Sequence, residues 1–176
     1  MSSASPAIAH RAPRQVLGAA LLFAGSAVTV GTALLFEHGF GYIPCALCLK
    51  ERVPYYVAIC ISAAAFVLAR HGASKGVVRM LLVLIGLVML WSLYLGLFHA
   101  GVEWRWWAGP TDCAMAGGAD LTGDLLSTLD SVHPPACDQA AGRFLGLSFA
   151  GWNAVASLIL ACIAFFAALG GRRDAR

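Results

Sequence analysis

The sequence predicts an all-α membrane protein built as a bundle of four transmembrane helices. Of its 176 residues, 60% are hydrophobic and only 12% are charged, and the mean hydropathy is +0.77. Such a chain is too apolar for an ordinary water-soluble domain. Four windows without Asp, Glu, Lys or Arg approach or reach the length that a hydrocarbon core of about 30 Å requires. They cover residues 16–36, 53–69, 80–98 and about 150–169, so we expect a single integral membrane domain over residues 1–176.

The first window could instead be the apolar region of a cleaved signal peptide, because Arg11 and Arg14 precede it. At 21 residues it is longer than the roughly 7–15 of such a region, and no small-x-small cleavage site follows it directly. We therefore expect it to be kept as a helix. The second window is the shortest, but Arg52 and Arg70 flank it and can extend to the two membrane interfaces.

The basic residues predict how the helices are oriented. Eight of the twelve Lys and Arg residues fall on one side of the predicted membrane, and an excess of basic residues marks the cytoplasmic side. Both termini should therefore be cytoplasmic, with outer loops at about 37–52 and 99–149. The net charge of +3 follows from this topology and does not indicate nucleic-acid binding. The eight residues are Arg11, Arg14, Arg70, Lys75, Arg79, Arg172, Arg173 and Arg176.

The second outer loop is long and carries two apolar features. Trp104, Trp106 and Trp107 follow the third window, as expected of an aromatic belt at the lipid headgroups. Further on, residues 119–132 have an apolar helical face, which Pro134 ends. We expect a short amphipathic helix there, lying on the membrane surface or packed on the outer ends of the bundle. Its apolar residues are Leu121, Leu125, Leu129 and Val132.

Four of the six cysteines fall on the outer side of this map. Cys60 and Cys162 lie within apolar windows, where a thiol usually behaves as a small hydrophobic group. In an oxidising compartment the outer four could form two disulfides in three possible connectivities, of which the simplest closes one bridge within each loop. The outer four are Cys45, Cys48, Cys113 and Cys137.

These four cysteines fit a redox site, a zinc site or a pair of structural disulfides. Structural zinc usually takes two closely spaced ligand pairs, but Cys113 and Cys137 are 24 residues apart. A disulfide between Cys45 and Cys48 would close almost no loop and so would stabilise the fold little. Small exposed disulfides are more often made and broken, which favours a redox pair.

Two features near Cys48 predict a reactive thiolate. Pro54 suits the first turn of a helix, so the positive end of the second helix should point toward the cysteines. Arg52 is four residues beyond Cys48 and would place a cation near its sulfur if the helix begins that early. Glu51 alone indicates nothing more than a membrane interface.

The electrons from such a redox pair need an acceptor, and no dinucleotide fingerprint is present. A lipid-soluble quinone is the simplest acceptor, and His99 could donate to its carbonyl.

The order of these features resembles the bacterial disulfide bond formation protein B (DsbB) family, a quinone-dependent membrane thiol oxidase. The motif PCALCLKER precedes the second window, a histidine ends the third, two widely spaced cysteines follow, and RFLGLSFAGWN precedes the fourth. The resemblance covers about residues 16–169. Vitamin K epoxide reductase-like proteins also use four helices, four cysteines and quinone, but in the reverse order, with the loop pair first.

The resemblance implies that the chain lies in the bacterial inner membrane and reoxidises a periplasmic DsbA-like thiol oxidase. It implies that the partner attacks Cys113, with Cys137 as its loop mate. Cys45 and Cys48 would pass the electrons to ubiquinone or menaquinone, and Cys45 would pair transiently with Cys137. The quinone site would consist of Cys48, Arg52 and His99, and no bound metal would be required. A disulfide-stapled membrane scaffold and a small transporter subunit are the non-enzymatic alternatives.

Overall fold

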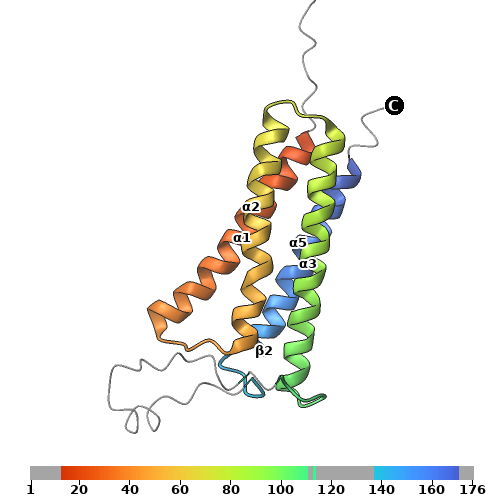
Figure 1. Ribbon diagram of the computed structural model, residues 1–176. Helices are drawn as coiled ribbons and strands as arrows, with labels where there is room; N and C mark the ends of the chain where they lie inside the picture. The colour runs from red at the N-terminus through yellow and green to blue at the C-terminus, as the bar shows by residue number, and fades with distance from the viewer. Residues whose placement is uncertain (1–12, 111–112, 114–136, 171–176) are drawn as a thin grey trace, which may run out of the picture.

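The computed structural model describes residues 13–110, 113 and 137–170, which include four long helices (Figure 1). Each helix is long and apolar enough to cross a membrane, so the predicted four-helix membrane bundle is confirmed. The helices are α1 (Pro13–Phe40), α2 (Ala46–Arg70), α3 (Lys75–Glu103) and α5 (Phe149–Gly170).

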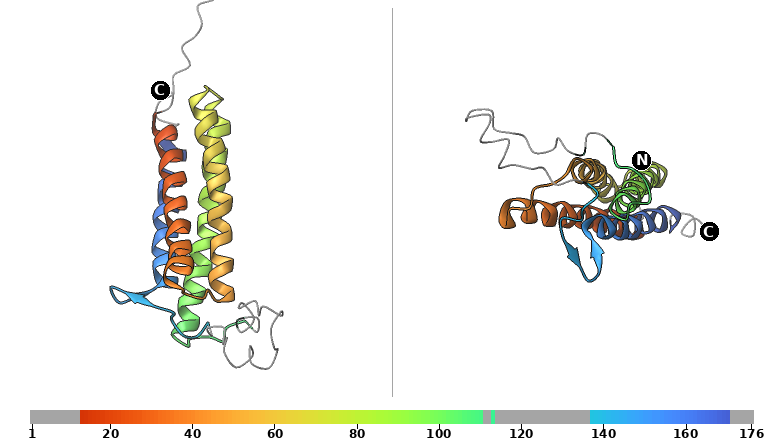
Figure 2. Two further views of the ribbon diagram at one scale, coloured as in Figure 1. Left: turned by 90° about the vertical axis from the view of Figure 1, so that its left-hand side faces the viewer. Right: turned by 90° about the horizontal axis from the view of Figure 1, so that it is seen from below.

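The helices run lengthwise beside one another in one bundle (Figure 2). α3 packs along both α2 and α5, and α1 packs along α2 and α5. The start of α1, the turn between α2 and α3 and the end of α5 lie together at one end, at the top of Figure 1. The start of α2 and the end of α3 lie at the opposite end. We call this second end, which holds Cys45, Cys48, Cys113 and Cys137, the cysteine end.

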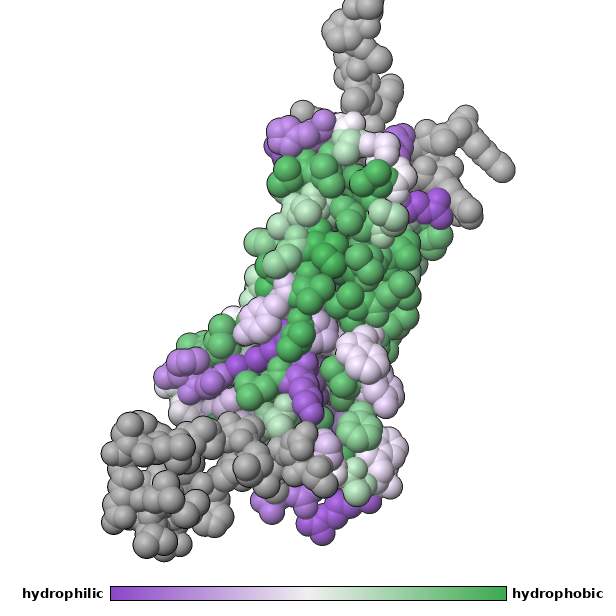
Figure 3. All heavy atoms as spheres, viewed as in Figure 1, coloured by the Kyte–Doolittle hydropathy of each residue, from purple (hydrophilic) through white to green (hydrophobic). Residues whose placement is uncertain are grey.

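The interior of the bundle is apolar, and so is most of its outer surface. Large side chains such as Leu22, Leu82 and Met89 are fully buried between the helices. On the outside, an apolar band crosses the middle of the bundle, and polar residues gather toward the two ends (Figure 3). An apolar belt of this kind is what a helical bundle presents to lipid, because the bilayer offers no water to solvate polar groups.

A chain of hydrogen bonds joins three of the helices inside the bundle. The Tyr55 hydroxyl of α2 donates to Asn153 Oδ1 of α5 at 2.6 Å and lies 2.8 Å from Ser157 Oγ. Ser157 in turn donates to Ser92 of α3 at 2.8 Å. Polar groups in a membrane are costly unless they pair, so this network holds α2, α3 and α5 in a fixed register.

Three helices extend beyond their predicted limits at the cysteine end. The sequence predicts an outer loop over residues 37–52, but α1 continues to Phe40 and α2 begins at Ala46. Pro54 therefore lies inside α2 and does not mark its first turn. The limits differ because the prediction placed Glu37, Arg52 and His99 outside the helices, whereas these side chains lie within the helices and pair with other helical side chains.

The part of the second outer loop that the structure describes folds back on the bundle. Trp107 donates from Nε1 to the carbonyl of Phe98 at 2.9 Å, and its ring stacks on the Phe98 ring. Before α5, β1 (Arg143–Phe144) and β2 (Leu147–Ser148) form a small antiparallel hairpin. The predicted surface helix at 119–132 lies outside the described residues, as do Arg11 and the arginines after residue 170.

Candidate redox site

The connection between α1 and α2 fixes the position of the first cysteine pair. Gly41 has φ +70°, a conformation that glycine adopts without strain, and it ends α1. Four residues later Cys45 is the N-cap of α2, and its Sγ accepts a hydrogen bond from the Cys48 backbone N–H at 3.3 Å. The sulfurs of Cys45 and Cys48 lie 3.0 Å apart and share a hydrogen bond. The pair is therefore a dithiol held in the first turn of α2.

A histidine from α3 completes the surroundings of Cys45. His99 Nε2 lies 3.7 Å from the Cys45 sulfur, and His99 Nδ1 lies 2.9 Å from Glu51 Oε1 of α2. Only 3% of the His99 side chain is exposed, against 9% for Glu51. When Nδ1 carries a proton, the Glu51 carboxylate accepts a hydrogen bond from it and orients the ring so that Nε2 faces the sulfur. Glu103, one turn along α3, places Oε1 4.0 Å from the same Nε2.

These contacts stabilise a thiolate on Cys45, not on Cys48 as the sequence predicts. The hydrogen bond from Cys48 lowers the pKa of Cys45, burial opposes that effect, and the hydrogen bond from His99 lowers the pKa further, to about 4. The N-cap position explains the difference. The side chain at the N-cap receives the free backbone N–H groups of the first turn, and Cys48 is one turn too far along the helix.

Arg52 has a different partner from the one that its spacing suggests. Its guanidinium forms an ion pair with Glu37 near the end of α1, and 13% of the Arg52 side chain is exposed. Arg52 and Cys48 are four residues apart on one helix and so lie on one face of α2. Arg52 thus remains on the same side as Cys48, but its charge is balanced by a carboxylate.

The second cysteine pair is oxidised and lies against the first. Cys113 and Cys137 form a disulfide with their Cα atoms 5.6 Å apart, as the simplest connectivity predicts. Cys137 belongs to one buried cluster with Cys45, Leu47 and Val102, and Cys48 and Cys113 pack on it. A dithiol and a disulfide thus share one apolar cluster. The four-thiolate zinc alternative does not fit this arrangement, because Cys113 and Cys137 are bonded to each other.

Three acidic residues of the site were missed or discounted at the level of sequence. Glu51 was assigned to the interface alone, and Glu37 and Glu103 were given no role. The separation of four residues between His99 and Glu103 places them on one face of a helix and could have indicated the pair. Cys48 and Glu51 are three residues apart, which is a weaker indication that their side chains share a helix face.

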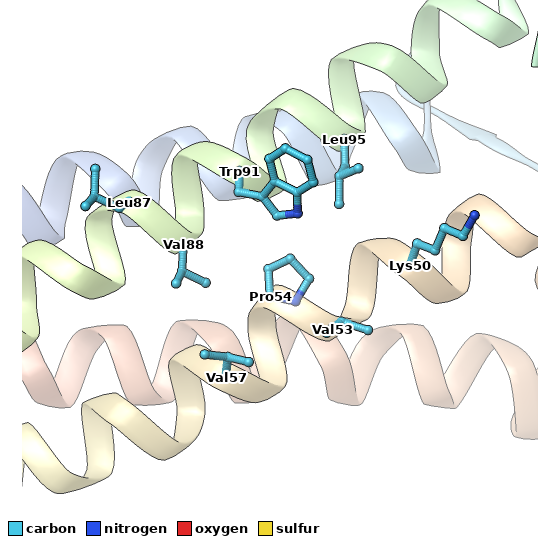
Figure 4. A pocket seen from close by; sticks show the side chains of 8 residues that line it. All are labelled: Lys50, Val53, Pro54, Val57, Leu87, Val88, Trp91 and Leu95. Carbon is cyan, nitrogen blue, oxygen red and sulfur yellow. The ribbon is translucent and has the colours of Figure 1, made fainter. Parts of the chain in front are cut away.

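A groove of about 550 Å³ runs along the outside of α2 and α3 (Figure 4). Its α2 residues recur at the spacing of one helical face, which is not the face of Cys48 and Arg52. The groove is therefore separate from the redox pair. Its lining residues are Lys50, Val53, Pro54, Val57, Leu87, Val88, Trp91 and Leu95.

Comparison with known proteins identifies the family. A protein-family model described as "Disulfide bond formation protein DsbB" matches residues 15–167. The chain belongs to the DsbB family. It is 32% identical over 152 residues to "Disulfide bond formation protein B" of Histophilus somni, covering 83% of this chain and 80% of the relative. The protein of that name in Aromatoleum aromaticum is 29% identical over 154 residues, covering 81% and 86% respectively. No solved structure matches the chain.

Membership of the DsbB family gives the chain a function in disulfide bond formation as a membrane oxidoreductase. The two cysteine pairs at one end of the bundle fit that function, because making a disulfide requires a centre that alternates between dithiol and disulfide.

The lowered pKa of Cys45 predicts an unusual titration. The ultraviolet absorbance of the thiolate, taken as wild type minus Cys45→Ser, should persist as the pH falls from 8 and disappear only near pH 4. The hydrogen-bond donors around Cys45 favour its thiolate form. Removing a donor should therefore raise the pH at which the thiolate absorbance is lost. In His99→Gln the midpoint should therefore rise. A midpoint above pH 8 in the wild type would contradict the assignment of the thiolate to Cys45.

Proposed function

We propose that this chain reoxidises a DsbA-like thiol oxidase of the thioredoxin fold and passes the electrons to membrane quinone. The observation that supports this most directly is the shared cluster of the Cys45–Cys48 dithiol and the Cys113–Cys137 disulfide. One pair can exchange with a soluble partner while the other exchanges with an acceptor in the membrane. A single cysteine pair would have to contact both the soluble partner and the acceptor in the membrane.

The first exchange involves the Cys113–Cys137 disulfide. A thiolate of the partner attacks Cys113 and breaks the bond to Cys137, which leaves as a thiolate. The second thiol of the partner then attacks the mixed disulfide, so that the partner is oxidised and Cys113 is released. The partner thus loses two electrons and two protons, and residues 113 and 137 hold them as a dithiol.

The second exchange moves the electrons to the pair on α2. Cys137 attacks Cys45 of an oxidised Cys45–Cys48 pair, which gives a transient Cys45–Cys137 disulfide and a free Cys48 thiolate. Cys113 then resolves this bond, and the loop disulfide is restored. The described state, with a loop disulfide and an α2 dithiol, is the one reached after this step.

The position of the thiolate changes during this sequence. In the dithiol, the helix N-terminus and His99 favour the thiolate on Cys45. Once Cys45 is bonded to Cys137, its sulfur no longer carries a charge, and Cys48 becomes the thiolate at the start of α2. This reconciles the contacts of Cys45 with a role for Cys48 as the residue that faces the acceptor.

The face of α2 shared by Cys48 and Arg52 is the proposed quinone site. Arg52 would donate hydrogen bonds to a carbonyl oxygen, and Glu37 holds its guanidinium in place. Bound ubiquinone or menaquinone would supply an acceptor for two electrons and two protons. A respiratory quinone also suits the direction of flow, since DsbA-type partners have a high potential of about −120 mV and need a still stronger oxidant. His99 would act through Cys45 and would not contact the quinone directly.

We place the chain in the bacterial inner membrane with the cysteine end in the periplasm. Arg14, Arg70, Lys75 and Arg79 lie at or near the opposite end, which is the pattern of a cytoplasmic face. Both termini would then be cytoplasmic. A disulfide-stapled scaffold would share this topology but would show no redox turnover.

The proposed activity predicts that the purified chain reduces a soluble quinone analogue when it is given a reduced thioredoxin-fold partner. Cys48→Ala should abolish turnover, because no thiolate would then face the acceptor. Cys113→Ser should fail to form the mixed disulfide with the partner. A Cys60→Ala variant serves as the matched control and should turn over like the wild type. Turnover by Cys48→Ala at the wild-type rate would disprove the mechanism.

Arg52 offers a test of the quinone site itself. In Arg52→Met the KM for quinone should rise about 10-fold or more with a smaller change in kcat, since hydrogen bonds to charged groups contribute about 1.5–3 kcal/mol. Lys50→Met removes a neighbouring cation from the other face of α2 and should leave KM nearly unchanged. Equal KM values for Arg52→Met and the wild type would remove Arg52 from the quinone site.

A further inference from the structure

The reduced site also gathers ligands that are typical of zinc. The Cys45 and Cys48 sulfurs and His99 Nε2 all lie within 4.8 Å of one another. In tetrahedral zinc sites the bonds are about 2.3 Å to sulfur and about 2.0 Å to nitrogen, so neighbouring ligand atoms lie about 3.5–3.8 Å apart. The separation of 3.7 Å between Cys45 Sγ and His99 Nε2 fits this range, and the 3.0 Å between the sulfurs needs only a small widening.

The groups behind these ligands also fit a metal. Glu51 contacts Nδ1 of His99, so Nε2 is turned toward the sulfurs. A carboxylate behind a histidine in this way is the usual outer partner of a zinc-bound imidazole, because it fixes the orientation of the ring and raises its basicity. The N–H of Cys48 and the end of α2 favour a sulfur in the thiolate form, which is the form that binds metal.

A second observation points to a ligand at the same place. The side chain of Glu103 is only 4% exposed, and its Oε2 is buried with no hydrogen-bond partner among the described residues. A buried polar atom without a partner is costly, and its other oxygen already lies 4.0 Å from His99 Nε2. A cation between the sulfurs and the imidazole would give this carboxyl group a partner and could take it as the fourth ligand.

The charges of the site favour a cation as well. One imidazole lies beside two carboxyl groups and the Cys45 sulfur. The nearby guanidinium of Arg52 is engaged by Glu37 and pairs away from this cluster. Cys48 is only partly buried, so an ion has a route to the sulfurs.

The geometry points to a zinc-binding site formed by Cys45, Cys48 and His99 in the reduced protein, with Glu103 as the nearby carboxyl group that would complete the coordination. Binding joins Zn²⁺ to both sulfurs and to Nε2 and releases two protons, the remaining thiol proton and the one on His99 Nε2, with no change in oxidation state. The metal is not a cofactor of disulfide formation. It holds the Cys45–Cys48 pair reduced and withdraws both sulfurs from exchange, so Zn²⁺ inhibits the chain reversibly. The inhibition, but not the binding, rests on the proposed function.

Cadmium provides a direct probe of this site. Cd²⁺ titrated anaerobically into the reduced full-length chain in detergent should give one equivalent of sulfur-to-cadmium charge-transfer absorbance, which added Zn²⁺ displaces. Cys48→Ser and His99→Gln should each weaken binding by more than about 100-fold, because changes in outer partners alone cost about 10–100-fold. Glu51→Gln should fall within that smaller range. His99→Cys, which supplies another soft ligand, should restore binding, and far-ultraviolet circular dichroism checks that every variant is folded.

Two control variants locate the ion. A Cys60→Ala, Cys162→Ala variant and a Cys113→Ser, Cys137→Ser variant should both bind Cd²⁺ like the wild type. Loss of binding in either control, or unchanged binding in His99→Gln and Cys48→Ser, would overturn the site. Zn²⁺ should also inhibit quinone turnover at the concentrations that occupy the site. A chain that binds Cd²⁺ as described but shows no turnover without metal would refute the proposed function and leave the metal site standing.

Discussion

The contact between the Cys45 sulfur and the His99 imidazole joins the start of α2 to the end of α3, and the site depends on it. The contact exists because α2 begins at Ala46, which makes Cys45 the N-cap, and because α3 continues past His99 to Glu103. Glu51 fixes the ring from the side of α2, so each helix positions a group of the other. A small shift of either helix along its axis would separate the sulfur from the ring. The Tyr55–Ser157–Ser92 hydrogen bonds oppose such a shift from within the bundle.

Burial and exchange chemistry are coupled at the cysteine end. Cys45 and Cys137 are 5% and 3% exposed, so water has little access to the sulfurs that exchange electrons. Exclusion of water strengthens each hydrogen bond to a thiolate, and the local donors can therefore decide which sulfur carries the charge. The same burial makes unpaired carboxyl groups costly, which is why Glu37, Glu51 and Glu103 matter to the account. Glu37 pairs with a guanidinium and Glu51 with an imidazole. Glu103 has one oxygen without a partner among the described residues, which an incoming cation could contact.

The sequence predicted the fold well and the site in part, and the division has a physical basis. Hydropathy located all four helices because a bilayer demands long apolar segments, and the position of the cysteines relative to them indicated a common end. The limits of the helices were missed because Glu51 and Arg52 look like membrane boundaries, although pairing with His99 and Glu37 lets both remain in a helix. The preference of the dithiol for a thiolate on Cys45 and not on Cys48 has a related cause. It depends on which residue is the N-cap, and the sequence alone placed the start of the helix about two turns too late.

We propose that the two cysteine pairs exchange directly through Cys45 and Cys137. The most direct measurement uses a Cys48→Ala, Cys113→Ser variant, in which only those two of the four outer sulfurs remain. After mild oxidation, mass spectrometry of a non-reduced digest should show a Cys45–Cys137 disulfide as the main product. The shared buried cluster already brings these residues together, so no unfolding should be needed. Recovery of Cys45 and Cys137 as free thiols, or of either bonded instead to Cys60 or Cys162, would contradict the account.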